Sequence, residues 1–286
     1  EEMMNNIISA IINLANNPKI ELIRKGSSHN RAKNMGEALE EYIKDLFAGT
    51  VTIDDPIVRN AALSATFSYL GNQSNPPDSM LFGGDAIEVK KIESKGAALA
   101  LNSSYPKAKL FADSPMIKKA CRDCENWSVK DMLYAVGVVN GNFLNSLAFV
   151  YGEDYCASKE IYEAIKTTIK NGVESIPDVE FTESKELGHV NRVDPLGITY
   201  LRIRGMWGIE NPFTVFNYVY KMDNTKAFNF MCIINNDKFN TFENISDLYD
   251  LSEKNKNLSI SDIRIKDPDN PARLKEAKLI AFSVKR

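Results

Sequence analysis

The chain is 286 residues long, which at roughly 150 residues per domain fits one large domain or two small ones. With 44% hydrophobic and 26% charged residues, it has the composition of an ordinary globular protein. Its 35 basic and 38 acidic residues give a net charge of −3, which excludes a histone-like basic coat but allows a local basic cleft. No apolar run approaches the ~18 residues that cross a bilayer, and we expect no signal peptide.

The few histidines and cysteines limit the kinds of catalytic and metal site that the chain can form. His29 and His189 are the only histidines, so nucleases that depend on paired histidine motifs are excluded. The sequence also lacks a Gly-x-Ser-x-Gly elbow, a Walker A loop and a GxGxxG motif after a strand. Cys121 and Cys124 form one CxxC pair without a second, which favours free thiols in a reducing cytoplasm over a zinc site. An enzyme of this composition would depend on carboxylates and lysines.

Hydrophobic periodicity and turn residues predict the elements in chain order. Helices are expected over residues 4–15, 35–47, 56–70, 115–124 and 158–171. Strands are expected as two short ones within 78–93, then over 131–139, 145–151, 197–204, 213–220, 227–234 and 277–284. Because no repeat, low-complexity tract or linker is visible, we expect one α/β domain over residues 1–286 with a last third rich in strands.

The segment from Pro77 to Lys91 is the most informative part of the chain. Glu88 and Lys90 alternate with Ile87 and Val89, so a strand would direct both polar side chains to one face and both β-branched side chains to the other. An acid and a lysine side by side on a strand whose opposite face is buried are typical of a catalytic pair. A solvated edge strand would show the same alternation.

Asp78 adds a second carboxylate from the preceding strand of a hairpin that turns at Gly83-Gly84. Two carboxylates can hold Mg²⁺, which takes few protein oxygens, while a lysine orients or deprotonates an attacking water. A two-residue turn would set Asp78 opposite Val89, on the wrong face for Glu88. A three-residue loop that includes Asp85 would set Asp78 opposite Lys90, and we therefore predict such a loop or a bulge.

The spacing of Pro77-Asp78 and Glu88-x-Lys90 resembles the motif of the PD-(D/E)xK nuclease superfamily, and in particular of type II restriction endonucleases. The residues around it, Gly-Gly-Asp-Ala-Ile-Glu-Val-Lys-Lys and then Leu-Asn-Ser-Ser-Tyr-Pro-Lys, are similar to those of the NgoPII-type enzymes, which cut within GGCC. The superfamily resemblance covers about residues 34–170. The closer resemblance extends through residues 201–207 and 209–212.

This resemblance implies a restriction-endonuclease-like core over about residues 34–170, in which helices flank a central mixed β-sheet, and a strand-rich DNA-recognition elaboration over about 180–286. It implies Asp78 and Glu88 as metal ligands, Lys90 as the catalytic lysine and Mg²⁺ as the cofactor. The implied enzyme is a homodimer in the bacterial cytoplasm, without a membrane partner. It would cut double-stranded DNA at a short palindromic, GC-rich site and leave 5′-phosphate and 3′-hydroxyl ends.

Many members of this superfamily also place a catalytic glutamate on the first core helix, and three residues compete for that role here. At about 100° per residue, Glu40 borders the apolar face that contains Leu39 and Phe47, whereas Glu37 and Glu41 point away from it. We therefore predict Glu40 as the catalytic glutamate. The alternative is an ordinary solvated helix acid.

A nuclease must hold phosphates, and the residues around 103–122 are rich in hydroxyl and basic side chains. The candidate phosphate contacts are Ser103, Ser104, Lys107, Lys109, Lys118, Lys119 and Arg122. Arg202 and Arg204 alternate with Leu201 and Ile203, which predicts two arginines on one face of a strand, suited to guanine O6 and N7, and two aliphatic side chains in the core. Trp207 is expected beside them. A solvated basic helix and surface ion pairs are the alternative interpretations.

Two other functions stay open at this point. A PD-(D/E)xK nuclease for repair or junction resolution would share the motif, although the long last third offers more base-reading surface than such an enzyme needs. A non-catalytic DNA-binding protein could also contain Glu-x-Lys without chemistry. Digestion of a plasmid with Mg²⁺ and with EDTA would separate these functions.

Overall fold

A computed structural model describes residues 5–22, 35–71 and 75–286, so His29 lies outside the described residues. The helices are α1 (Ile7–Asn16), α2 (Met35–Ala48), α3 (Pro56–Thr66), α4 (Lys119–Asp123), α5 (Gly152–Tyr155), α6 (Lys159–Glu174), α7 (Pro212–Val215), α8 (Asn236–Phe239) and α9 (Ile245–Lys254). The strands are β1 (Phe67–Leu70), β2 (Ser79–Leu81), β3 (Ala86–Ile92), β4 (Leu99–Asn102), β5 (Lys109–Phe111), β6 (Val129–Asn140), β7 (Phe143–Tyr151), β8 (Glu180–Phe181), β9 (Gly188–Asn191), β10 (Leu201–Ile203), β11 (Trp207–Ile209), β12 (Lys226–Asn235), β13 (Leu258–Asp267) and β14 (Asn270–Lys285).

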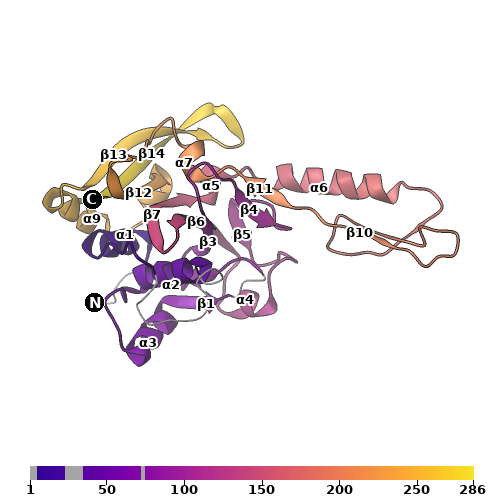
Figure 1. Cartoon of the computed structure of the whole chain (residues 1–286), viewed down its shortest axis with the longest axis horizontal. Coiled ribbons are helices and arrows are strands. Elements are labelled where there is room, and N and C mark those ends of the chain that lie inside the picture. The colour runs from indigo at the N-terminus through magenta and orange to yellow at the C-terminus, as the bar shows by residue number, and fades with distance from the viewer. Residues whose placement is uncertain (1–4, 23–34, 72–74) are drawn as a thin grey trace.

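A nine-stranded sheet forms the centre of the molecule (Figure 1). Its strand order is β1-β2-β3-β6-β7-β12-β14-β13, and β5 pairs with the end of β6 outside this path. Strand β3 runs parallel to β6 and β7 runs parallel to β12, whereas the other neighbours are antiparallel. The predicted fold class, a mixed sheet flanked by helices, is confirmed. Strands β12 and β14 come from the last third of the chain and continue the sheet that the first half begins.

Both faces of the sheet are covered, which explains why β6 and β12 are continuous apolar runs. Helices α1, α2 and α9 cover one face, where Ile11 and Leu39 are fully buried. The start of α1 is set by Asn6, whose side chain accepts a hydrogen bond from the Ser9 N–H in a capping box. Helix α7 and the β4 region cover the other face, where Phe216 is buried.

The predicted helix over 56–70 is too long by four residues, because its end is a strand. Asp55 caps α3 as expected, but the helix ends at Thr66, whose hydroxyl bonds back to the Ala62 carbonyl. Phe67 then pairs with Leu81 and begins β1. Burial of Phe67 in the core and pairing with β2 outweigh the local helical pattern.

The predicted strand over 213–220 is wrong, and part of this segment is helix α7. The Asn211 side chain accepts hydrogen bonds from the Phe213 and Thr214 N–H groups, and Pro212 stands at the first helical position. This Asn-Pro pair is a helix start signal that outweighs the aromatic residues that follow it. Helix α9 and strand β13 were not predicted, because their polar residues conceal a short amphipathic helix and an exposed outer strand.

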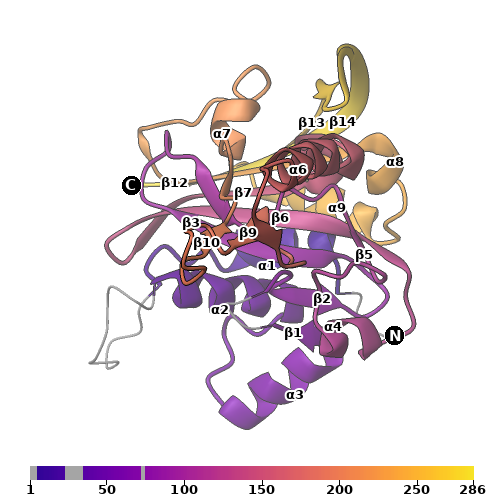
Figure 2. The same ribbon diagram turned by 90° about the vertical axis from the view of Figure 1, so that its right-hand side faces the viewer.

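Residues 159–206, here called the arm, extend away from the central sheet (Figure 1), and Figure 2 shows their helix α6 end-on. The arm contains α6 and a separate three-stranded sheet in the order β10-β9-β8. Leu201 is 51% exposed, so the prediction that it lies in the core is wrong: β10 pairs only within the arm. No helix in the described parts of the chain is long and apolar enough to cross a membrane.

Candidate active site

The β2–β3 hairpin sets the geometry of the site. Ser79 pairs with Ile87, and the Leu81 N–H donates to the Asp85 carbonyl at 2.9 Å, so the loop is Phe82-Gly83-Gly84. The prediction of a three-residue loop is confirmed in length, but the loop lies one position earlier and excludes Asp85. Extending the register sets Asp78 opposite Glu88 instead of Lys90. The face is unchanged, because the shift of register is an even number of residues.

A buried lysine from β6 holds this loop in place. The Lys130 ammonium donates to the Leu81 and Gly84 carbonyls at 2.9 and 2.8 Å and lies 3.0 Å from a Glu125 carboxylate oxygen. The Glu125 carboxylate also accepts from the Gly83 N–H at 3.2 Å. Lysine is almost never buried unless it is fully paired, so Lys130 is a positioning residue for the hairpin.

Replacing Lys130 with methionine is expected to lower the free energy of unfolding by about 3 kcal/mol, because Glu125 and two carbonyls lose their buried donor. Urea denaturation measures this difference. Lys119→Met is the matched control: Lys119 is 87% exposed in its ion pair with Asp123, and its loss should change the free energy by less than about 0.5 kcal/mol. An equally small effect at Lys130 would contradict its role in the loop.

Asp78, Glu88 and Lys90 line one cavity on the face of the sheet away from α2. An Asp78 carboxylate oxygen accepts from the Val89 N–H at 2.6 Å, and the Lys90 ammonium lies 3.5 Å from a Glu88 oxygen. Burial and the nearby Asp78 charge raise the pKa of Glu88 from its ordinary 4.5 to about 8. Burial also raises the pKa of Asp78, although Val89 and Lys90 act in the opposite direction. The cavity thus holds two carboxylates close together, and the positive charge around them is too small to keep both ionised.

The donor set of this pair fits a hard divalent cation. Glu88 Oε2 is buried and has no hydrogen-bond partner, an arrangement that is costly unless something else binds the oxygen. Mg²⁺ is bound in proteins through one or two carboxylates plus waters and substrate phosphates, and Asp78 and Glu88 supply that number. No group of three or more acidic, histidine or cysteine side chains in the described residues forms a fuller metal site.

Glu40, on α2, is near enough to Asp78 for the charges of the two carboxylates to interact. Burial and the Asp78 charge raise the pKa of Glu40 to about 7. Glu41 points outward and binds Arg59 at 2.6 Å, and Glu37 is exposed. Glu40 borders the apolar face of α2, and this position brings it toward Asp78 as expected. The catalytic role of Glu40 stays a prediction.

Three of the predicted phosphate contacts line the same cavity, which has a volume of about 90 Å³. Ser103 and Ser104 follow β4, and the Lys107 ammonium donates to the Ser104 hydroxyl. Burial lowers the pKa of Lys107 to about 8, although the Glu88 charge acts against that change. Sequence reasoning missed Tyr134, which lines the cavity and whose hydroxyl accepts from the Lys107 N–H at 2.9 Å. In the sequence, Tyr134 stands within the apolar run of β6 and looks like an ordinary core residue.

The other basic residues of this segment have different surroundings. Lys109 pairs with Asp131 at 2.5 Å and lines an adjoining cavity of about 540 Å³. Lys118 and Lys119 stand at the start of α4, and Lys119 pairs with Asp123. Arg122 donates to the Ala112 and Ser114 carbonyls at 2.6 and 2.9 Å, so it fastens the loop before α4. These four residues do not line the cavity of the carboxylates.

Arg202 on β10 and Arg204 directly after this strand do lie on one side, where both bind the Glu186 carboxylate. Arg202 makes two bonds at 2.7 and 3.0 Å and Arg204 one at 2.8 Å, and these bonds lower the pKa of Glu186. Trp207 lies at the base of the arm, where its ring meets those of Tyr105 and Tyr162 edge to face. The four cysteines are free, and Cys121 and Cys156 are buried.

Comparison with known proteins shows which family the chain belongs to. The chain matches the NgoPII restriction endonuclease family over residues 5–266. It is 58% identical over 278 residues to the type II restriction enzyme NgoPII of Neisseria gonorrhoeae, which covers 97% of this chain and 99% of that protein. This chain belongs to the NgoPII restriction endonuclease family. No solved structure matches it.

Membership of the NgoPII family confirms the class of enzyme expected from Pro77-Asp78 and Glu88-x-Lys90, a type II restriction endonuclease. The match extends from the start of α1 into β13, so it includes the hairpin, the arm and the strands that complete the sheet. The family resemblance seen in the short motif therefore holds over nearly the whole chain.

Proposed function

We propose that this NgoPII-family enzyme hydrolyses one phosphodiester bond in each strand of a short palindromic, GC-rich DNA site, with GGCC as the candidate sequence and Mg²⁺ as cofactor. The products would carry 5′-phosphate and 3′-hydroxyl ends, and the place of action would be the bacterial cytoplasm. The observation that supports this proposal most is the cavity in which Asp78, Glu88 and Lys90 meet the hydroxyls of Ser103 and Ser104.

Asp78 and Glu88 would hold the metal, and Lys90 would act on the attacking water. When bound, Mg²⁺ would stabilise the charge that develops on the phosphoryl oxygens. The Lys90 ammonium, held near Glu88, can orient the water and stabilise the negative charge that develops as the water loses a proton and attacks. Ser103, Ser104 and Lys107 can bind the phosphate oxygens. Each residue thus contributes positioning or charge to phosphoryl transfer.

Recognition of the bases would depend on residues outside the cavity. Arg202 on β10 and Arg204 just after it hold their guanidinium groups together at Glu186, and two arginines suit the O6 and N7 atoms of guanine. In the free protein Glu186 binds both arginine side chains. To contact DNA, the arginines would have to leave Glu186 or bind it and a base at the same time. Further candidate DNA contacts outside the cavity are Lys109, Lys118, Lys119, Arg122 and Trp207.

The experiment is digestion of plasmid DNA with Mg²⁺ and with EDTA, followed by sequencing of the cut ends. We expect discrete fragments with Mg²⁺, no cleavage with EDTA, and ends that ligate without added phosphorylation. A synthetic duplex that contains GGCC and one with the same bases in scrambled order test the site directly. Random nicking would indicate a repair nuclease instead, and uncut DNA together with retained binding would indicate a non-catalytic binder.

Binding of Mg²⁺ in the absence of DNA is expected to strengthen as the pH rises from 6 to 9. The pKa of Glu88 is about 8 in the folded protein, and a carboxyl must lose its proton to bind metal. Isothermal titration calorimetry at pH 6, 7, 8 and 9 measures the affinity and the protons released. An affinity that does not change over this range would contradict the assignment of Glu88 as a ligand.

A further inference from the structure

Helix α6 exposes its most apolar face to solvent, which is unusual for a helix of 16 residues. None of its residues is buried, and Ile161, Ile165 and Ile169 are 48%, 54% and 42% exposed. Most of the stability of helices in proteins comes from packing of an apolar face. No residue of α6 is buried within the described parts of the chain, so its isoleucine stripe is a surface that another molecule could cover.

The inner side of α6 is already occupied by contacts within the chain. Tyr162 stacks on Tyr105 with ring centroids 5.7 Å apart, and Val173 lies against Gly188 of β9, where a Cβ atom would meet it at 2.7 Å. These contacts fix the rotation of the helix. The stripe of Ile161, Ile165 and Ile169 lies beside Tyr162 and Val173 on the helix circumference, and its side chains stay about half exposed.

The isoleucine stripe and the positions beside it on α6 contain no charged residue. At about 100° per residue, Ala164, Thr168 and Gly172 lie beside the isoleucines, and every charged residue of α6 falls on the remaining part of the circumference. A surface that met DNA phosphates would require lysines and arginines here.

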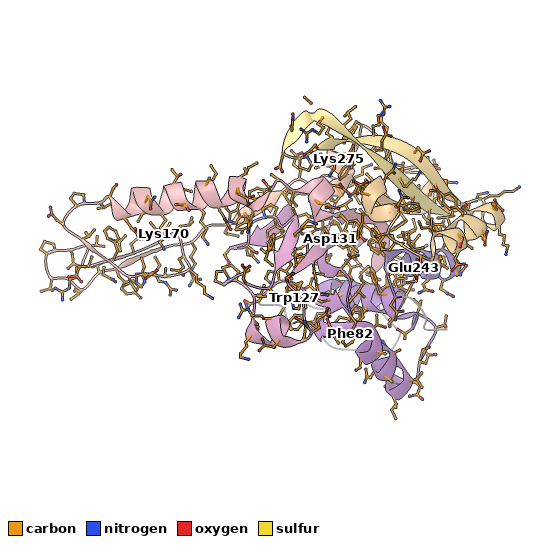
Figure 3. The ribbon with its side chains drawn as sticks, turned by 180° about the vertical axis from the view of Figure 1, so that it is seen from behind. Phe82, Trp127, Asp131, Lys170, Glu243 and Lys275 are labelled. Carbon is orange, nitrogen blue, oxygen red and sulfur yellow. The ribbon has the colours of Figure 1, made fainter. Side chains whose placement is uncertain are left out.

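The rest of the arm also exposes apolar side chains. Of the nineteen large hydrophobic side chains that are exposed in the described residues, ten lie within the arm, including Leu196, Ile198 and Met206. A stable interface buries roughly 800 Å² on each partner, more than one stripe of isoleucines supplies. Figure 3 shows that Lys170, on the same helix, lies far from Asp131 in the core, so the arm can contact another molecule along its length.

We infer that the isoleucine face of α6 is the contact with a second copy of this chain. An uncharged face is complementary to itself about a twofold axis, where a face of one charge would repel its copy. The inference rests on the proposed function, because cutting both strands of a palindrome calls for two sites related by the symmetry of the DNA. The two copies would place their α6 helices side by side and in opposite directions.

Charge insertion on this face tests the inference. Sedimentation equilibrium without DNA should show the wild type at twice the chain mass, and Ile165→Glu/Ile169→Glu should raise the dissociation constant at least 100-fold. Thr167→Glu, on the charged side of the same helix, should leave it unchanged. Circular dichroism of the variants checks folding. In plasmid digestion, the double variant should accumulate nicked circles where the wild type gives linear DNA.

Cross-linking supplies a second and independent measurement. Ile165→Cys should join to its copy through a short bismaleimide, whereas Thr167→Cys and the wild type, with its native cysteines, should not. A double variant that stays dimeric would overturn the inference, as would a monomeric wild type that cuts both strands. Loss of DNA binding with an intact dimer would show instead that DNA contacts this face. If the wild type cuts no DNA, the proposed function fails, while sedimentation and cross-linking still decide the interface.

Discussion

Replacing Lys90 with alanine is expected to slow DNA cleavage by about 10³-fold or more, which is the scale of losing a general acid–base or charge-stabilising group. The Lys90 ammonium lies 3.5 Å from Glu88 and is the cation of the motif that shares the cavity with both carboxylates. Binding of a duplex that carries the site should change little, because the proposed phosphate contacts and the arginines at and after β10 remain. Single-turnover cleavage and fluorescence anisotropy measure the two effects separately.

The adjoining lysine supplies the control for this experiment. Lys91 follows Lys90 on β3, so its side chain lies on the opposite face of the sheet, where it pairs with Glu93 at 3.3 Å. Lys91→Ala should keep the cleavage rate within about threefold of the wild type, the size of an ordinary surface effect. Equal losses from both substitutions would mean that the strand tolerates no change here, and would contradict a specific role for Lys90.

Replacing Glu88 with glutamine is expected to abolish cleavage and, at pH 8 to 9, to stabilise the metal-free protein. In the wild type the pKa of Glu88 rises from 4.5 to about 8 on folding, so folding favours the protonated form. The stability associated with that proton is fully present below pH 4.5 and is lost as the pH rises through 8. Glutamine has no charge to bury, and the variant should therefore gain about 2 to 4 kcal/mol at high pH.

Thermal or urea unfolding at pH 5, 7 and 9, with EDTA and with Mg²⁺, tests this prediction. With EDTA the difference between variant and wild type should grow from pH 5 to pH 9. Added Mg²⁺ should stabilise the wild type and leave the variant unchanged. Glu93→Gln is the control, since Glu93 has an 82% exposed side chain and faces water. A wild type and a Glu88→Gln variant with the same pH profile and the same response to Mg²⁺ would remove Glu88 from the metal site.

The position of the candidate catalytic groups on one face could be predicted because it depends only on local periodicity. Alternate residues of a strand face the same side, so Glu88 and Lys90 must point together wherever β3 lies. Glu40 follows from the same reasoning on a helix, because its angular position next to Leu39 directs it toward the edge of the packed face. Both predictions need only the period of the element and no knowledge of its neighbours.

The exact register of the hairpin could not be predicted, because a residue far along the chain decides it. Lys130 and Glu125 bind the loop from the region of β6, and they fix it at Phe82-Gly83-Gly84. For the same reason the helix end at Thr66 was missed, since the pairing of Phe67 with Leu81 replaces the last helical turn. Long-range pairing outweighs local preference at both places.

The sequence by itself determined the class of fold, the family and the Asp78, Glu88 and Lys90 set, because a motif and its periodicity are properties of neighbouring residues. Only the tertiary structure decided how these groups act on one another. Burial raises the pKa of Glu88 and lowers that of Lys107, and neither shift follows from spacing. The arm was also invisible in the sequence, since the isoleucines of α6 look like an ordinary core face until the structure shows that nothing in the described chain covers them.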